Sequence, residues 1–111
     1  MEQFGNQESW YPFVARAELL VENSDASLVA DVRELSRQGC RLRLSGRPTP
    51  GASVVVKIYA WPHLFRARGT VRYSDPILGV CIGFTEIETQ CTYSLDALLR
   101  EAEGNQRNKS G

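Results

Sequence analysis

Residues 27–44, SLVADVRELSRQGCRLRL, contain two stretches of alternating residues on either side of a short polar segment. In Ser27–Leu35 apolar residues recur at every second position from 28 to 32, which is typical of a β-strand with one buried face. Cys40–Leu44 alternates apolar and basic residues in the same way. Ser36–Gly39 has the composition of a tight turn. The segment therefore predicts two β-strands joined by a turn.

Four further stretches show strand-like alternation, separated by turns rich in Pro, Gly, Asn and Asp. In the last of them the small residues at positions 79, 81 and 83 leave one face open to close approach by a neighbouring group. Six short strands about ten residues apart favour an all-β fold, a six-stranded antiparallel barrel whose closure removes exposed edges. The four further strands are expected over Val14–Glu22, Ser53–Ala60, Phe65–Tyr73 and Leu78–Phe84.

The hydrophobic period changes near the C-terminus, where Leu95, Leu98 and Leu99 have helical spacing. We expect one α-helix over Tyr93–Glu103, ended by Gly104 as a C-cap and packed on one opening of the barrel. The polar ends predict a flexible N-terminal arm over residues 1–12 and a disordered tail over residues 104–111. Residues 13–103 then form a single domain of barrel and helix.

Thirteen basic and thirteen acidic residues leave the 111-residue chain without net charge, so no overall field attracts it to nucleic acid or anionic lipid. No apolar run approaches the roughly 18 residues that span a bilayer, and the first residues lack the pattern of a signal peptide. The three cysteines include no Cys-x-x-Cys pair, which argues against a disulfide framework or a zinc site. We expect a cytoplasmic protein with reduced thiols and no membrane insertion.

Residue patterns that support catalysis are scarce in this sequence. His63 is the single histidine, and no carboxylate lies near it in the chain to form a general-base pair. Ser36 lacks the Gly-x-Ser-x-Gly frame of a serine hydrolase. We therefore expect a protein that is not an enzyme and that carries neither a metal nor a cofactor.

Arginine is the unusual feature of the composition, because lysine occurs only at Lys57 and Lys109. A guanidinium pairs bidentately with phosphate and stacks on a nucleobase, so the bias favours phosphate or base recognition. The same side chains can instead form cross-strand ion pairs on a barrel exterior, and both interpretations stay open. The arginines on or beside predicted strands are Arg16, Arg33, Arg37, Arg41, Arg43, Arg47, Arg66, Arg68 and Arg72.

The segment VRELSRQGCRL at 32–42, followed by GTVRY at 69–73 and GVCIGF at 79–84, resembles the PilZ domain family. The resemblance extends from about Tyr11 to Arg100, and the order of the predicted elements matches as well. PilZ domains are bacterial six-stranded barrels with a C-terminal helix, and many bind the second messenger cyclic di-GMP. The resemblance therefore implies cyclic di-GMP as a ligand and a role in bacterial signalling.

The family's ligand motif Asp/Asn-x-Ser-x-x-Gly forms a turn around a guanine base, and here Ser36 and Gly39 match it while Glu34 holds the first position. Gly39 is expected to permit a turn conformation that a side chain would oppose. The family's Arg-x-x-x-Arg motif, which grips phosphate before the first strand, is absent from SWYPFVAR at 9–16. The resemblance implies a cyclic di-GMP site at Arg16, Arg33, Glu34, Ser36, Arg37 and Gly39.

The stretch before the first strand carries three aromatic residues, Trp10, Tyr11 and Phe13. Aromatic rings can stack on bases, but in such a position they more often pack against the domain that follows, and we expect packing here. Ser9 and Phe13 have the spacing of the absent arginines. Arginine at both positions, together with Glu34→Asp, is expected to restore the family pattern and strengthen nucleotide binding.

Three functional hypotheses follow from these observations. The first is a cyclic di-GMP receptor whose binding is weak because each absent phosphate contact removes ~1.5–3 kcal/mol. The second is a degenerate PilZ adaptor that binds a protein partner without nucleotide. The third, which the zero net charge disfavours, is a small barrel that binds nucleic acid through its strand arginines.

Overall fold

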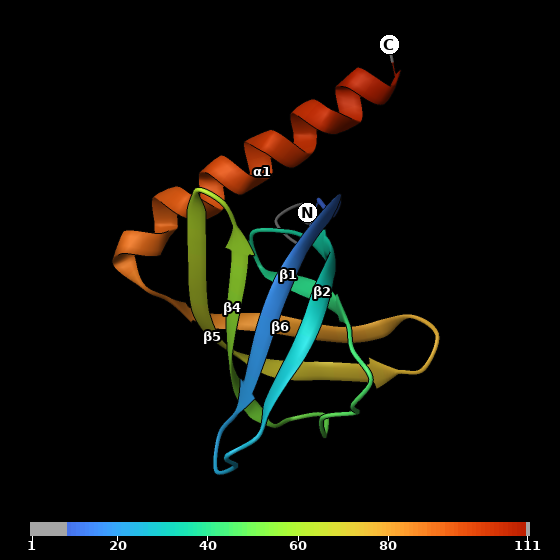
Figure 1. Cartoon of the computed structure of the whole chain (residues 1–111), viewed down its shortest axis with the longest axis vertical. Helices are drawn as coiled ribbons and strands as arrows, with labels where there is room; N and C mark the ends of the chain where they lie inside the picture. Colours follow the sequence, from blue (N-terminus) through green and yellow to red (C-terminus); the bar gives the residue numbers. More distant parts are fainter. Residues whose placement is uncertain (1–8, 111) are drawn as a thin grey trace, which may run out of the picture.

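The computed structural model describes residues 9–110, with side chains described for 9–89, 91 and 94–104. Antiparallel pairing between neighbouring strands closes a barrel in the order β1-β2-β3-β6-β5-β4, and a single helix follows the last strand (Figure 1). The predicted six-stranded barrel with a C-terminal helix is confirmed. The elements are β1 (Tyr11–Val21), β2 (Ser27–Leu35), β3 (Gly39–Arg43), β4 (Ser53–Ala60), β5 (His63–Asp75), β6 (Gly79–Ile87) and α1 (Thr89–Ser110).

The element ends differ from the sequence prediction mainly at the two termini. β1 begins at Tyr11, so positions 11 and 12 of the predicted arm belong to a strand, while its residues 1–8 lie outside the described residues. α1 begins at Thr89, before the predicted start, and continues through Gly104 to Ser110. The predicted C-cap at Gly104 is therefore wrong, and positions 104–110 of the predicted tail are helical. Gly104 takes no positive φ, so it continues the helix instead of ending it.

The core fills the barrel interior and continues under the helix. Strand β4 shows the period-2 pattern directly, with Val54, Val56 and Ile58 buried and the residues between them more exposed. The predicted contacts of the helix are confirmed, because Leu95, Leu98, Leu99 and Ala102 of α1 are buried in the same hydrophobic cluster. Burial of each leucine side chain contributes about 1.5–3 kcal/mol to stability.

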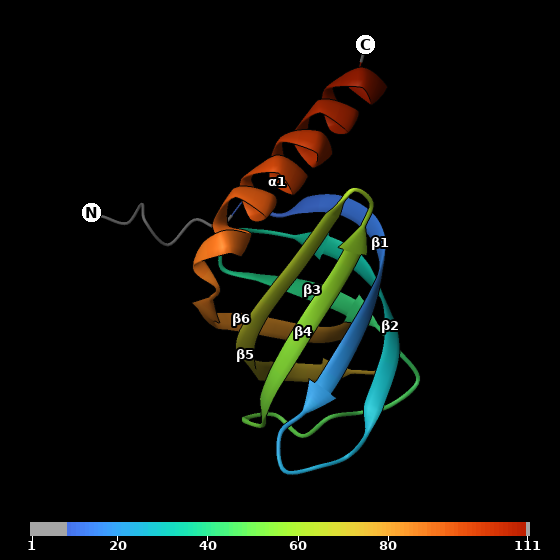
Figure 2. The same ribbon diagram turned by 60° about the vertical axis from the view of Figure 1, so that its left-hand side comes forward.

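Helix α1 lies against β1 and β5 at one end of the barrel, and its C-terminal half extends beyond the strands (Figure 2). The hydrogen bond from the Cys91 Sγ to the Leu64 carbonyl, at 3.8 Å, joins the start of the helix to β5. Within residues 9–110, no helix combines the length and the apolar character that crossing a membrane would require.

Strand β6 has one face of small residues, as the sequence predicts, and a side chain occupies the space they leave. The Arg72 side chain of β5 crosses Gly83 so closely that a Cβ at that glycine would lie 2.4 Å from the Arg72 Nε. On the inner face, the Phe65 and Phe84 rings pack with their centroids 5.2 Å apart. The absence of a side chain at Gly83 thus lets an arginine lie flat on the barrel.

All three cysteines are buried, and within the described part of the chain they form no disulfide. Burial raises the pKa of the Cys40 thiol, and the neighbouring Cys81 adds to this shift. Because the thiolate is the reactive form, the Cys40 thiol is unreactive at neutral pH.

Candidate functional site

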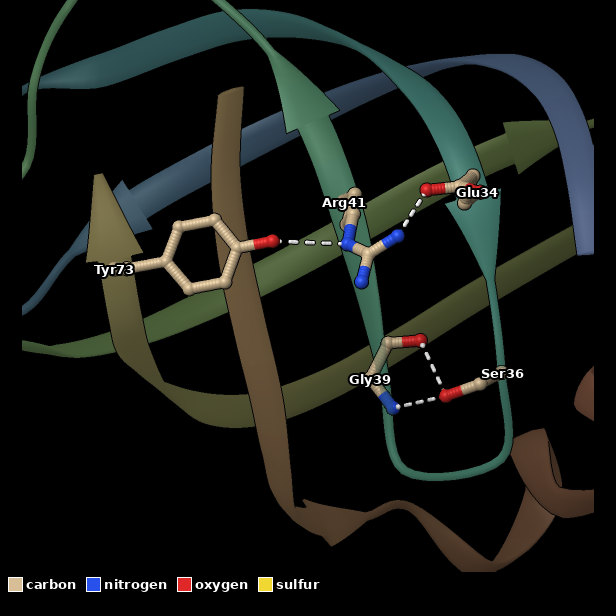
Figure 3. A network of polar contacts seen from close by, with 5 residues as sticks. All are labelled: Glu34, Ser36, Gly39, Arg41 and Tyr73. Carbon is tan, nitrogen blue, oxygen red and sulfur yellow. Dashed lines mark hydrogen bonds and ion pairs between the residues drawn. The ribbon is translucent and has the colours of Figure 1, made fainter. Parts of the chain in front are cut away.

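The Ser36 turn, residues 36–39, joins β2 to β3 and carries the matched motif residues. Ser36 is fully buried, at 0% exposure, and its Oγ accepts hydrogen bonds from the backbone N–H groups of Gln38 and Gly39, both at 3.1 Å. The same hydroxyl donates to the Gly39 carbonyl at 3.3 Å (Figure 3). A serine hydroxyl has one proton to donate and two lone pairs to accept with, so the turn itself uses its full capacity.

Gly39 is required here for a different reason from the predicted one. It is the first residue of β3, lies opposite Gly83 of β6, and does not take a positive φ. A Cβ at this position would lie 2.1 Å from the Ile82 carbonyl oxygen, much closer than any real Cβ contact. Glycine therefore permits the close approach of β3 to β6 and is not needed for a left-handed turn conformation.

Glu34 lies at the end of β2 in a polar cluster with two aromatic residues. Its carboxylate pairs with the Nη1 of Arg41, its neighbour in the β2–β3 ladder, and the Arg41 Nε donates to the Tyr73 hydroxyl at 2.9 Å (Figure 3). The Trp10 ring stacks on the Arg41 guanidinium, 4.4 Å from its centroid. These contacts raise the pKa of Arg41, mainly through the hydrogen bond to Glu34. The carboxylate expected to meet a guanine edge is therefore already engaged.

Two arginines of the predicted site also have carboxylate partners. Arg37 points from the Ser36 turn to α1, where its Nη1 lies 2.6 Å from an Asp96 carboxylate oxygen. Arg16, on β1, lies opposite Asp31 of β2, and the two side chains pair at 3.3 Å. Both pairs are largely exposed, so each contributes little to stability. In each pair, however, the carboxylate compensates the positive charge of the arginine with which a phosphate would have to pair.

The structure brings together only part of the predicted site. Ser36, Arg37 and Gly39 share one turn, and Glu34 lies two residues before it. Arg16 lies elsewhere on the exterior, across from Asp31. Arg33 lines a hollow between β3 and the β5–β6 turn and a second hollow together with Glu34, and neither hollow includes Ser36, Arg37 or Gly39. The six predicted residues therefore do not form one continuous ligand surface.

The aromatic residues before and within β1 pack against the barrel, as the sequence predicts. Phe13 is buried in the core at 6% exposure, and Tyr11 packs against the same cluster from the outside. An arginine at position 13 would place a charge in the core, so the expectation that Phe13→Arg restores the family motif is wrong. Ser9, by contrast, is exposed and lines a hollow together with Arg37.

The arginine cleft is a second candidate site, which the sequence analysis does not predict. It is a hollow of about 280 Å³ lined by residues of β2, β3, the β3–β4 loop and the β5–β6 hairpin. Its polar lining includes Arg33, Arg43, Arg47, Ser74 and Asp75. The only sequence signal was the arginine content of these segments, because nothing in the local pattern shows that segments so far apart in the chain converge.

Elsewhere the arginines favour the ion-pair interpretation over an extended nucleic-acid footprint. Arg66 pairs with Glu88 at 3.4 Å, and Arg68 pairs with Glu22 at 3.8 Å. Among the described residues, no group of histidine, cysteine and acidic side chains is arranged to hold a metal ion. Comparison of the sequence with protein-family models and with curated proteins finds no match, so the functional argument rests on the fold and on these contacts.

Proposed function

We propose that this chain is a PilZ-like bacterial signalling module in cyclic di-GMP-linked regulation, with nucleotide binding that is weak or lost. The closed barrel with its C-terminal helix agrees with the architecture that the sequence resemblance implies. The residues Ser36 and Gly39 occupy the β2–β3 turn, where the family motif belongs. One observation carries the reduced affinity: the polar groups around this turn are bound to other groups of the protein.

The energetic reason is competition between the nucleotide and the protein's own carboxylates. A phosphate of cyclic di-GMP must displace Asp96 to reach the Arg37 guanidinium, and a guanine must displace Arg41 to reach the Glu34 carboxylate. Each charge-assisted contact contributes about 1.5–3 kcal/mol, so the loss of two lowers affinity by about two to four orders of magnitude. From a submicromolar family site, this gives a dissociation constant no tighter than about 10 μM.

Titration calorimetry with cyclic di-GMP tests the proposal, and the Asp96→Asn variant tests whether Asp96 competes with the nucleotide for Arg37. The variant removes the negative charge that compensates Arg37, so we expect it to bind about three- to tenfold more tightly than the wild type. Glu22→Gln is the matched control, because it removes one carboxylate from a pair with Arg68 outside the Ser36 turn and leaves affinity unchanged. Submicromolar binding by the wild type, or an equal gain in both variants, contradicts the proposal.

A second candidate, a protein-interaction adaptor acting without nucleotide, is favoured by an exposed apolar patch. Trp61 and Val14 are 95% and 84% exposed, and Tyr59 and Leu64 are exposed beside them on the β4–β5 hairpin. Exposed apolar patches on monomeric domains commonly mark interaction surfaces. The patch lies next to the start of β1, whose residue Arg16 is the ladder neighbour of Tyr59.

The adaptor candidate is tested with a photocrosslinking amino acid at position 61 in cells, with position 29 as the control. Val29 is also exposed but lies on β2, with β1 between it and β4. We expect one protein to crosslink at position 61 only, and the purified pair to lose affinity in Trp61→Ser but not in Val29→Ser. Equal crosslinking at both positions contradicts a specific surface.

A further inference from the structure

The arginine cleft is built by segments from four parts of the chain. Arg33 lies at the irregularity in β2 pairing between Val32 and Glu34, and Arg43 is the last residue of β3. The β5–β6 turn closes the opposite wall and ends at Gly79, whose φ is +93°. A Cβ at Gly79 would lie 2.5 Å from the Leu42 carbonyl oxygen, so glycine allows this turn to approach β3. The walls of the cleft are therefore formed by strands and by a turn that packs closely against β3.

The charge of the cleft is strongly positive. Among the described residues, no ion pair engages Arg33, Arg43 or Arg47, in contrast to Arg37 of the Ser36 turn and to Arg66 and Arg68 of β5. Asp31, the ladder neighbour of Arg43, is paired with Arg16 instead. Three guanidinium groups therefore face the one carboxylate that lines the cleft, which leaves two uncompensated positive charges.

That carboxylate, Asp75, is held by the turn backbone. Its Oδ1 accepts hydrogen bonds from the N–H groups of Ile77 and Leu78, at 2.7 and 2.8 Å. These backbone hydrogen bonds are the main reason that the pKa of Asp75 lies below its ordinary value, and the charge of Arg47 lowers it further. Asp75 therefore shapes the β5–β6 turn, and it does not form an ion pair with Arg33 or Arg43.

A buried hydroxyl without a partner lies in the same cleft. The Ser74 Oγ is shielded from solvent and has no hydrogen-bond partner among the described residues. Nearly all buried polar groups in proteins have a partner, and an exception calls for an explanation such as strain, a functional role, or a bound water or ion. This hydroxyl is independent of the arginines and supplies one further donor for an anion.

The rim of the cleft is apolar. Ile77 and Leu78 are 89% and 66% exposed at the β5–β6 turn, beside the arginines. We propose that the arginine cleft binds a phosphate monoester that carries an apolar group, with Arg43 and Arg47 pairing with the phosphate, Ser74 donating to it and Ile77 contacting the apolar part. Two uncompensated guanidinium charges match the dianion of a phosphate monoester. This inference does not depend on the proposed cyclic di-GMP role.

Nuclear magnetic resonance titration of the full chain with phenyl phosphate at constant ionic strength tests the cleft. We expect saturable shifts of the Gly46, Ser74 and Gly79 amides with a dissociation constant of about 1 mM or tighter. Arg43→Gln weakens binding at least about fivefold. Arg68→Gln, which removes the same charge from an exposed site on β5, changes it less than about twofold. Melting temperatures without phosphate check that both variants are folded.

A second arm separates a soluble phosphate ester from a lipid headgroup. Vesicles of phosphatidylcholine with phosphatidic acid present the same phosphate monoester on an apolar surface, and vesicles with phosphatidylserine provide the control. Sedimentation with phosphatidic acid vesicles that is lost in Arg43→Gln assigns a lipid source, while binding of phenyl phosphate alone assigns a soluble one. Failure of both arms, or equal loss in Arg68→Gln, overturns the inference. Amide shifts by cyclic di-GMP around Gly39 report separately on the Ser36 turn.

Discussion

The Ser36 turn and the arginine cleft have similar chemical groups but use them differently. Each contains a buried serine hydroxyl and at least one arginine. In the turn, Ser36 bonds to its own backbone and Arg37 pairs with Asp96. In the cleft, the Ser74 hydroxyl has no partner among the described residues, and no described ion pair engages Arg43. Residue types alone therefore do not identify a ligand site, because hydrogen-bonding capacity already used by the fold is not available to a ligand.

The largest expected effect is a loss of stability at the Ser36 turn, which tests the structural role of its glycine. Gly39→Ala places a Cβ 2.1 Å from the Ile82 carbonyl, so the β6 backbone must move, and we expect a loss of about 3 kcal/mol in the free energy of unfolding. Urea denaturation measures it. Gly104→Ala is the control, and it should increase the free energy of unfolding. Nothing lies within 4 Å of a Cβ at this position, and alanine stabilises a helix interior by about 0.5–1 kcal/mol relative to glycine. A cost below about 1 kcal/mol at Gly39 contradicts the packing argument.

The two serines provide the direct comparison between the regions. Ser36→Ala removes the acceptor of the Gln38 and Gly39 N–H groups, so we expect a loss of about 1–3 kcal/mol in unfolding free energy. Ser74→Ala removes a hydroxyl without a described partner and changes stability by less than about 0.5 kcal/mol without ligand. The same variant weakens phenyl phosphate binding, whereas Ser36→Ala does not. Equal destabilisation by the two substitutions would remove the distinction.

The smallest expected effect is a pH dependence of the contribution that Asp75, in the wall of the arginine cleft, makes to the free energy of unfolding. Because backbone hydrogen bonds lower the folded-state pKa of Asp75 below 3.8, its contribution to stability is present above that value and is lost as pH falls through the folded pKa. Asp75→Asn does not titrate, so the difference in unfolding free energy between wild type and variant should shrink between about pH 5 and pH 2. Urea denaturation at several pH values measures it, and a difference that is constant with pH contradicts the assignment.

The sequence predicts the fold well where the local pattern and the tertiary packing agree. β2 and β4 have the predicted bounds because their alternation is regular and turn residues flank them. The end of α1 is predicted too early because glycine frequently terminates helices, whereas here the helix continues through Gly104. Gly39 illustrates the same limit: its identity was predicted to matter, but the reason, the backbone of β6, is a tertiary contact.

Less of the candidate site can be predicted, because its decisive contacts are long-range. The pairing of Glu34 with Arg41 follows from the register of two strands joined by a short turn, so the sequence contains that information. Arg37 and Asp96, in contrast, are 59 residues apart, and only the position of α1 on the barrel brings them together. The cleft depends on the convergence of β3 with the β5–β6 turn, and the unpartnered hydroxyl of Ser74 is visible only in three dimensions.

Closure of the barrel also limits how another protein can bind this one. Each of the six strands has a neighbour on both sides, although β2 pairs with the shorter β3 only from Asp31 to Leu35. Recognition by β-augmentation, in which an extended peptide adds a strand to a free sheet edge, therefore has only short stretches at strand ends, such as residues 27–30 of β2, to pair with. A protein partner then has to recognise mainly side chains, which makes its binding sensitive to single surface substitutions such as Trp61→Ser.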